Sequence, residues 1–195
     1  MSDVLDGIKA STKTETLIIS IAAGVKVSKI VQILGDKAVV RVMPNTPALI
    51  GEGASALYAN EKGKARIDQA VRILSSVGKA VVVDEENLID TVTAVSGSGP
   101  AYFFLLIEEM IKTAVSFGLT EEIAKDLVLQ TARGAAMLAV EAGAKGESPV
   151  ELRRKVTSPG GTTEAAIKTF IEGNFGDLVS TALKSAKDRS EELSG

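Results

Sequence analysis

The stretch VVRVMPNTP, from Val39 to Pro47, decides the class of fold. Its first five residues are apolar except for one arginine, and two prolines then stop the run. A short continuous apolar run of this kind is typical of a buried strand, and proline ends it because proline cannot donate a ladder hydrogen bond. We therefore predict a strand over residues 39–43, with a loop over residues 44–47 at its carboxyl end.

Apolar runs of the same kind lie on both sides of this stretch. The further strand candidates are residues 17–21, 55–59 and 79–83. Between the strands, residues 25–34 and 62–77 repeat apolar side chains at helical spacing, and the second of these segments ends at Gly78, a good residue for a helix C-terminus. Strands that alternate with helices predict an α/β region with a largely parallel sheet.

The pattern changes near residue 90, and no convincing strand follows Pro100. Proline is suited to the first position of a helix, and apolar residues recur at helical spacing from there to Gly118. Thr120 can cap the next helix, and Ser148 to Glu151 form a capping-box pattern. Two last helices are predicted over residues 162–171 and 176–192. We therefore expect an α/β part followed by an all-α part.

The α/β part is expected to be incomplete at its amino end. Before Leu17 there is only a short, polar, helix-like stretch, and no Gly-x-Gly-x-x-Gly occurs there. A doubly wound domain normally opens with a strand that leads into a Gly-rich turn. The alternative is a small complete sheet with unusual edges.

Composition narrows the possible chemistry. The chain has 22 Lys and Arg against 25 Asp and Glu, so no basic surplus is present to neutralise nucleic-acid phosphates. Apolar runs are too short for a membrane span, and no signal peptide is visible, so we expect a cytoplasmic protein. The absence of Cys and His leaves hydroxyls, carboxylates, lysines, backbone amides or a cofactor to do any chemistry, and we expect no metal site. Abundant aliphatic residues favour an oligomer.

The stretch VTSPGGTTE, residues 156–164, has the composition of an anion site. Paired glycines let backbone amides approach a ligand, and they lead into a predicted helix whose free N–H groups favour an anion. The hydroxyls of Ser158, Thr162 and Thr163 converge there, which suits a carboxylate or a phosphate. The alternative is an ordinary turn between two helices with threonine caps.

Three other segments are candidate ligand loops. VSGSGPAY, residues 95–102, lies where the two parts meet, and domain junctions are favoured ligand sites. Residues 21–25 and 44–47 each follow a predicted strand, where ligands bind in doubly wound sheets. The alternatives are a flexible interdomain turn and ordinary strand-to-helix loops.

Taken together and in this order, five segments resemble the pyrroline-5-carboxylate reductase family. They are IAAGV (21–25), VMPNTP (42–47), GEGA (51–54), DTVTAVSGSGPAY (90–102) and VTSPGGTT (156–163). The resemblance runs from about Leu17 to the C-terminus. It implies a partial Rossmann-like parallel sheet over residues 1–90, from a domain that binds NADPH or NADH. It also implies a helical substrate-binding and dimerisation domain over residues 91–195, which forms a homodimer and often a larger ring.

The resemblance also implies roles for particular residues. The loop that includes Ser158, Gly160, Gly161 and Thr162 would hold the substrate carboxylate. Thr163 would hydrogen-bond the ring nitrogen and is the candidate proton donor. The residues expected to line the nicotinamide side of the cofactor cleft are Ala22, Ala23, Gly24, Pro44 and Asn45. The residues expected to close the pocket near the reacting carbon are Ser96, Gly97 and Ser98.

The implied activity is the reduction of the C=N bond of 1-pyrroline-5-carboxylate to L-proline, in proline biosynthesis. The Gly-rich turn that holds the cofactor pyrophosphate in the family is not found in this sequence. Two alternatives stay open, because this turn is missing and because the SPGGTT loop fits any imine that carries a carboxylate. One is a catalytically inactive oligomerisation and substrate domain, and the other is a reductase of a related cyclic imino acid.

Overall fold

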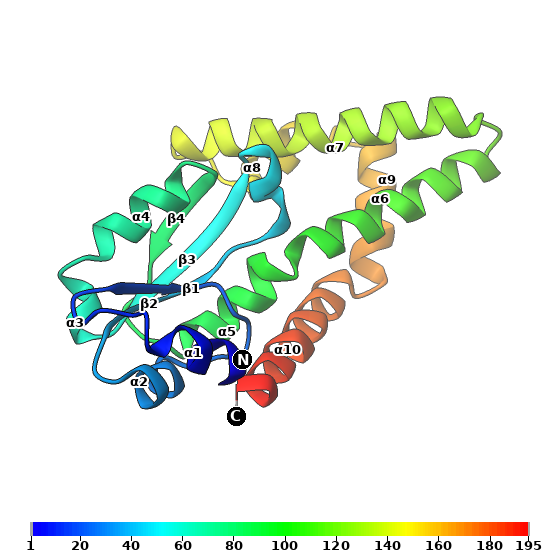
Figure 1. Ribbon diagram of the computed structural model, residues 1–195. Helices are drawn as coiled ribbons and strands as arrows, with labels where there is room; N and C mark the ends of the chain where they lie inside the picture. Colours follow the sequence, from blue (N-terminus) through cyan, green and yellow to red (C-terminus); the bar gives the residue numbers. More distant parts are fainter. Residues whose placement is uncertain (1, 195) are drawn as a thin grey trace. The chain divides into compact units, whose positions relative to one another are not determined.

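The computed structural model describes residues 2–194 and divides into two compact units (Figure 1). The sheet unit comprises the chain up to Pro100 together with the residues from Thr181 onward, and the helical unit comprises Ala101–Ser180. The final helix therefore contributes residues to both units. The predicted functional boundary near residue 90 stays a prediction.

The sheet unit contains four strands in the order β1-β2-β3-β4. They are β1 (Leu17–Ser20), β2 (Ala38–Met43), β3 (Gly53–Ala59) and β4 (Gly78–Val82). The β1–β2 and β3–β4 pairs are parallel, with Leu17 opposite Ala38 and Gly53 opposite Gly78. The predicted α/β class and all four predicted strands are confirmed.

The central pair, β2 with β3, is antiparallel, with Val40 opposite Ala59 and Met43 opposite Ala56. The expectation of a parallel sheet is wrong for this pair. Its connection holds only a short 3₁₀ turn, Thr46–Ile50. A parallel pair needs a crossover of a dozen or more residues, usually a helix, and this connection is too short to supply one.

Helices cover both faces of the sheet. They are α1 (Ser2–Lys9), α2 (Val27–Leu34), α3 (Glu61–Lys64), α4 (Ile67–Ser75) and α5 (Leu88–Val92). The single helix predicted over residues 62–77 is two helices, and the first is capped by Asn60, which accepts a hydrogen bond from the Gly63 N–H. After α5 the chain continues through one π-helical turn, Thr93–Gly97.

Alternation of side chains along β2 divides the core between the two faces. Val39 is fully buried in a cluster with residues of α1 and α2, such as Leu5 and Ile30. Val40 and Val42 lie in the opposite cluster with Leu57 of β3 and Leu74 of α4. Because both faces are covered, the inner strands read as continuous apolar runs in the sequence.

Long helices make up the rest of the chain. They are α6 (Gly99–Ser116), α7 (Glu121–Ala144), α8 (Pro149–Lys155), α9 (Thr162–Glu172) and α10 (Phe175–Ser194). The predicted caps are confirmed: the Thr120 hydroxyl accepts from the Ile123 N–H, and Ser148 and Glu151 form the capping box. The pKa of Glu151 lies below its ordinary value because the Ser148 N–H and hydroxyl donate to its carboxylate.

Large apolar side chains of the helical unit remain exposed within the single chain. Phe103 is 68% exposed, Phe104 61% and Val140 75%. Among the described apolar residues of this unit, only Ala124, Val128 and Ala142 are buried. No helix within residues 2–194 combines the length and apolar character needed to cross a bilayer.

Candidate active site

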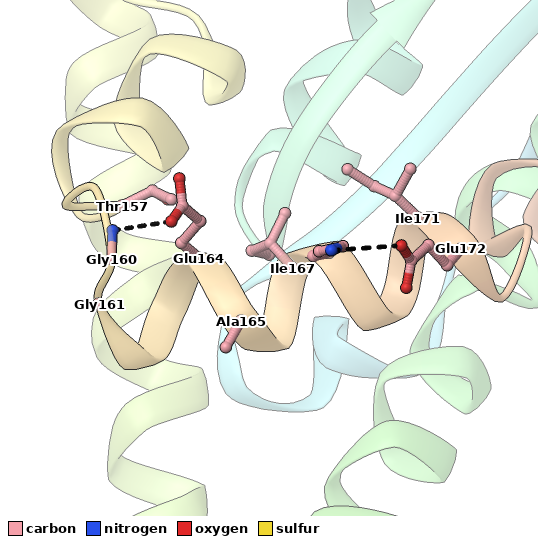
Figure 2. Close-up of a pocket in the computed structure, with 9 residues that line it drawn as sticks. Thr157, Gly160, Gly161, Glu164, Ala165, Ile167, Ile171 and Glu172 are labelled. Carbon is pink, nitrogen blue, oxygen red and sulfur yellow. Dashed lines mark hydrogen bonds and ion pairs between the residues drawn. The ribbon is translucent and has the colours of Figure 1, made fainter.

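The loop between α8 and α9 has the tight glycine geometry that its sequence predicts. Gly160 has φ of +71°, in the left-handed region that favours glycine, and Gly161 is extended at the N-cap of α9. The Gly160 N–H donates to Oε2 of Glu164 at 2.8 Å, as Figure 2 shows. The Gly161 N–H donates to the Ser158 carbonyl oxygen at 3.0 Å. Both glycine amides are therefore engaged within the loop.

The donors that remain lie at the two residues that follow Gly161 directly and at Ser158. Thr162 and Thr163 are the first two residues of α9, where backbone N–H groups have no acceptor within the helix. Within residues 2–194, the hydroxyls of Ser158, Thr162 and Thr163 make no hydrogen bond. Free amides in the first turn, with three free hydroxyls beside them, lie at the positive end of an 11-residue helix and suit an anion such as a carboxylate.

An open cavity of about 720 Å³ lies beside the same loop. Its lining residues include Gly160, Gly161 and Glu164, followed by Ile167 and Lys168 of α9 (Figure 2). Ser158, Thr162 and Thr163 are not among them. The free hydroxyls therefore do not belong to this cavity, and the anion site is defined by the loop donors.

The second group of candidate residues follows β1 and β2. Because these strands are parallel neighbours, their carboxyl ends meet at one edge of the sheet, and Ala22–Gly24 and Pro44–Asn45 follow them there. Gly24 has φ of +68°, and a Cβ atom at this position would lie 2.8 Å from the Leu193 carbonyl oxygen. Gly24 thus needs both the left-handed conformation and the absent side chain.

Asn45 connects this edge to the Ser96–Ser98 segment. Its Nδ2 donates to the Ser96 carbonyl oxygen at 3.0 Å, and its Oδ1 accepts from the Ala54 N–H at 2.8 Å. A Cβ atom on Gly97 would lie 2.6 Å from Cε of Met43, so the two segments pack closely. The side chain of Asn45 therefore links the loop after β2 to the π-helical turn by a hydrogen bond.

The sheet unit thus brings together Ala22–Gly24, Pro44–Asn45 and Ser96–Ser98, whereas the Ser158–Thr163 loop belongs to the helical unit. The residues at the strand ends are small and uncharged, which is compatible with a flat ring such as a nicotinamide. They offer no Gly-rich set of amides for a pyrophosphate, and no Gly-x-Gly-x-x-Gly occurs in the sequence. The residues present therefore fit the reactive end of a dinucleotide. Within residues 2–194 no group of three or more acidic residues could hold a metal ion.

Two polar contacts that involve a buried charged side chain were not predicted from the sequence. Arg41 of β2 is 2% exposed, and its Nη1 lies 3.0 Å from Oε1 of Glu86, which also accepts from the Val27 N–H at 2.7 Å. The only signal for this pair was an arginine inside an apolar strand. Asp90 is 5% exposed and accepts from the hydroxyls of Ser190 at 2.6 Å and Ser194 at 3.3 Å. No local pattern links positions a hundred residues apart.

Comparison with known proteins places these features in a family. Residues 86–193 match the family described as pyrroline-5-carboxylate reductase dimerisation. A pyrroline-5-carboxylate reductase of Pseudomonas aeruginosa is 51% identical over 195 residues, which cover 99% of this chain and 70% of that protein. A Synechocystis protein of the same name is 43% identical, over 97% of this chain and 71% of that protein.

Solved structures agree with these matches. The structure of a pyrroline-5-carboxylate reductase from Coxiella burnetii superposes with a TM-score of 0.92 and 43% identity, covering 100% of this chain and 72% of that one. The Plasmodium falciparum pyrroline carboxylate reductase with NADP bound gives a TM-score of 0.87 and 34% identity, with 100% and 77% coverage. The predicted resemblance is confirmed, and the chain belongs to the pyrroline-5-carboxylate reductase family.

Proposed function

We propose that this protein carries out the reduction of 1-pyrroline-5-carboxylate to L-proline with NADPH or NADH, in proline biosynthesis. The observation that carries the proposal is that a reductase of this name is 51% identical over almost the whole chain. The free donors at the start of α9 supply the carboxylate site that such a substrate requires. A bound NADPH or NADH would supply the hydride that reduces the C=N bond at the imine carbon, which is C5 in the numbering of the product proline.

The protein's first task is to hold the substrate carboxylate. We assign this role to the Ser158–Thr163 loop, in which the Ser158 hydroxyl and the N–H groups of Thr162 and Thr163 are the donors left free. Gly160 and Gly161 shape the loop that presents these donors. The positive end of α9 adds to the attraction for the carboxylate.

The second task is to orient the ring for attack. Thr163 hydrogen-bonds the ring nitrogen in this proposal, mainly as a positioning group, and it is the candidate donor of the proton that nitrogen gains as C5 accepts the hydride. The chain has no histidine or cysteine to do this work. Hydride transfer does not need either residue, because position and electrostatics are what the protein must provide.

The sheet unit serves the cofactor in this proposal. Ala22, Ala23, Gly24, Pro44 and Asn45 line the nicotinamide side, and Ser96, Gly97 and Ser98 close the pocket near C5. The exposed apolar side chains of α6 and α7 support a homo-oligomer, as the family match to a dimerisation region suggests. We also propose a cytoplasmic location for the protein.

The test is oxidation of NADPH by the purified chain, with and without 1-pyrroline-5-carboxylate. We expect turnover that depends on this imine. The control substrate is a six-membered cyclic imine that carries a carboxylate, which the same loop could hold. A higher kcat/KM for the six-membered ring would favour the related reductase, and no turnover with either imine, from a folded protein, would contradict the proposal.

Thr163→Ala is expected to lower kcat about a hundredfold or more, because a positioned donor at the reacting nitrogen contributes at least that much. Thr163→Ser keeps the hydroxyl and should retain much of the activity. Unchanged kinetics for the alanine variant would remove Thr163 from the mechanism.

A further inference from the structure

Glu164 occupies a position that the proposed chemistry does not explain. It lies in the first turn of α9, and its Oε2 accepts the Gly160 N–H at 2.8 Å (Figure 2). The carboxylate thus reaches back along the chain onto the loop that we assign to the substrate carboxylate. An acidic side chain in the first turn also interacts favourably with the positive end of the helix.

This bond determines which donors the loop can offer. Gly160 has the left-handed conformation, with φ of +71°, and Glu164 ties its N–H to the following helix. The Gly161 N–H is tied to the Ser158 carbonyl oxygen. With both glycine amides engaged, a carboxylate has the Thr162 and Thr163 amides and the neighbouring hydroxyls to bind. Without Glu164, Gly160 loses its acceptor and the loop gains freedom, which a ligand must remove on binding.

The same side chain also opposes an anionic ligand. An exposed negative charge in the first turn repels a second carboxylate at the helix N-terminus, and salt screens this repulsion. Glu164 therefore has two effects of opposite sign. Its hydrogen bond orders the loop, whereas its charge weakens the binding of an anion.

We propose that Glu164 is a positioning residue that sets the affinity of the Ser158–Thr163 loop for the substrate carboxylate. It holds Gly160, directs the carboxylate to the donors at Thr162 and Thr163, and keeps the affinity moderate through its charge. This inference rests on the proposed function of the loop. It concerns substrate binding, and the hydride transfer itself does not involve Glu164.

Two variants separate the two effects. Glu164→Gln keeps an acceptor for Gly160 and removes the charge, so KM for 1-pyrroline-5-carboxylate should fall about threefold at low salt, the size expected for one exposed charge. The difference from the unchanged protein should vanish at high salt. Glu164→Ala removes both features, so its KM should lie about fivefold above that of Glu164→Gln, the size of one lost hydrogen bond. Turnover at saturating substrate should change less than twofold in both variants, because Glu164 affects the binding of the substrate and of the transition state equally in this proposal.

A second measurement does not depend on catalysis. Hydrogen exchange of the Gly160 amide, followed by NMR, should be slow in the unchanged protein and in Glu164→Gln, and faster in Glu164→Ala. The matched control is Glu172→Ala, which removes an exposed carboxylate from the other end of α9, where it pairs with Lys168. This control should change neither KM nor the exchange of Gly160.

The outcomes distinguish the role of Glu164 from the proposed function of the protein. Equal KM values for Glu164→Gln and Glu164→Ala, with Gly160 exchange unchanged in both, would overturn the role of Glu164 while turnover of the imine keeps the proposed function. No imine turnover by the unchanged protein would overturn the proposed function, and with it the role of Glu164 in substrate binding. The exchange of Gly160 would then still report whether Glu164 holds the loop.

Discussion

The sheet unit and the helical unit are stabilised in different ways. In the sheet unit, buried side chains form two clusters, and polar contacts join distant segments, as in Asn45 with Ser96 and Asp90 with Ser190. In the described part of the helical unit, hydrogen bonds between side chains and nearby groups are local, such as Thr120 with Ile123. Its apolar side chains are largely exposed within one chain.

This difference shows where each unit finds its stability. The sheet unit buries its two core clusters against its own strands and helices. The helical unit has side-chain caps at the starts of α7 and α8 but leaves much of its apolar surface uncovered, and most helical stability in proteins comes from packing of such surface. We therefore expect the helical unit to depend on association with a second chain.

The largest expected effect tests the packing of the sheet core. Leu57 is fully buried in the cluster that β2 and β3 form with α4, so Leu57→Ala should lower the free energy of unfolding by about 3 kcal/mol, because it leaves a cavity. Urea denaturation at a fixed chain concentration measures the change. Leu49, which is 89% exposed in the same unit, supplies the control, and Leu49→Ala should have almost no effect. Equal losses in the two variants would contradict the packing described here.

The next prediction tests the uncovered surface of the helical unit. Phe103→Asp should shift the protein from oligomer to monomer, with a loss of at least about 2 kcal/mol in association, because a charge cannot be buried unpaired at an interface. Sedimentation over a range of concentrations measures the shift. Phe103→Leu keeps an apolar side chain and should stay associated. Unchanged association of Phe103→Asp would show that this part of α6 is not covered by a partner.

A smaller effect is expected at the buried contact of the C-terminal helix. Asp90→Ala leaves the buried Ser190 and Ser194 hydroxyls without their acceptor, so it should cost about 2 kcal/mol in unfolding free energy. A double-mutant cycle with Ser190→Ala measures the coupling. Asp84→Ala, at an exposed residue of the same unit, is the control and should have almost no effect on the free energy of unfolding. Purely additive losses at Asp90 and Ser190 would mean that the hydrogen bond contributes no stability.

The smallest expected effect concerns the local capping of the helical unit. Ser148→Ala removes the cap of α8 and should cost about 1 kcal/mol at neutral pH. The pKa of Glu151 is lowered first by the Ser148 N–H, whose bond the variant keeps, and then by the Ser148 hydroxyl, whose bond the variant removes. The stabilisation from the hydroxyl bond to the carboxylate is present above the ordinary pKa of 4.5 and is lost as the pH falls through the lower value in the folded state. The difference in free energy of unfolding between the variant and the unchanged protein should therefore become smaller below pH 4.5. Glu121, whose pKa is also lowered but by Lys125, keeps its contact in the variant and serves as an internal reference. A difference that stays constant down to pH 3 would contradict this reading of the capping box.

Local patterns predicted much of this structure. Apolar runs located all four strands, and the caps at Thr120 and Ser148 located helix starts, because both signals depend on residues close in sequence. The direction of β3 was predicted wrongly, although the short interval between the apolar runs at residues 39–43 and 55–59 leaves too little chain for a crossover helix. Contacts between distant segments could not be predicted, such as Arg41 with Glu86 and Asp90 with Ser190. The hydrogen bond from the Gly160 N–H to Glu164 depends on the conformation of the loop, which the sequence pattern does not give. The motifs therefore indicated the candidate loops, whereas the hydrogen bonds within these loops became known only from the structure.

The antiparallel pairing of β2 with β3 also bears on the order of folding. Only residues 44–52 separate these strands, whereas the parallel pairs are joined through longer crossovers that contain helices. Closing a shorter loop costs less chain entropy, so we expect the central pair to form first and the outer strands to join it later. Conservative truncations at Val42 and Leu57 should then slow refolding, and those at Ile18 should mainly speed unfolding, in stopped-flow measurements. A sheet that grows outward from its middle keeps its most apolar strands paired from the earliest stage, which limits the time that their edges are open to aggregation.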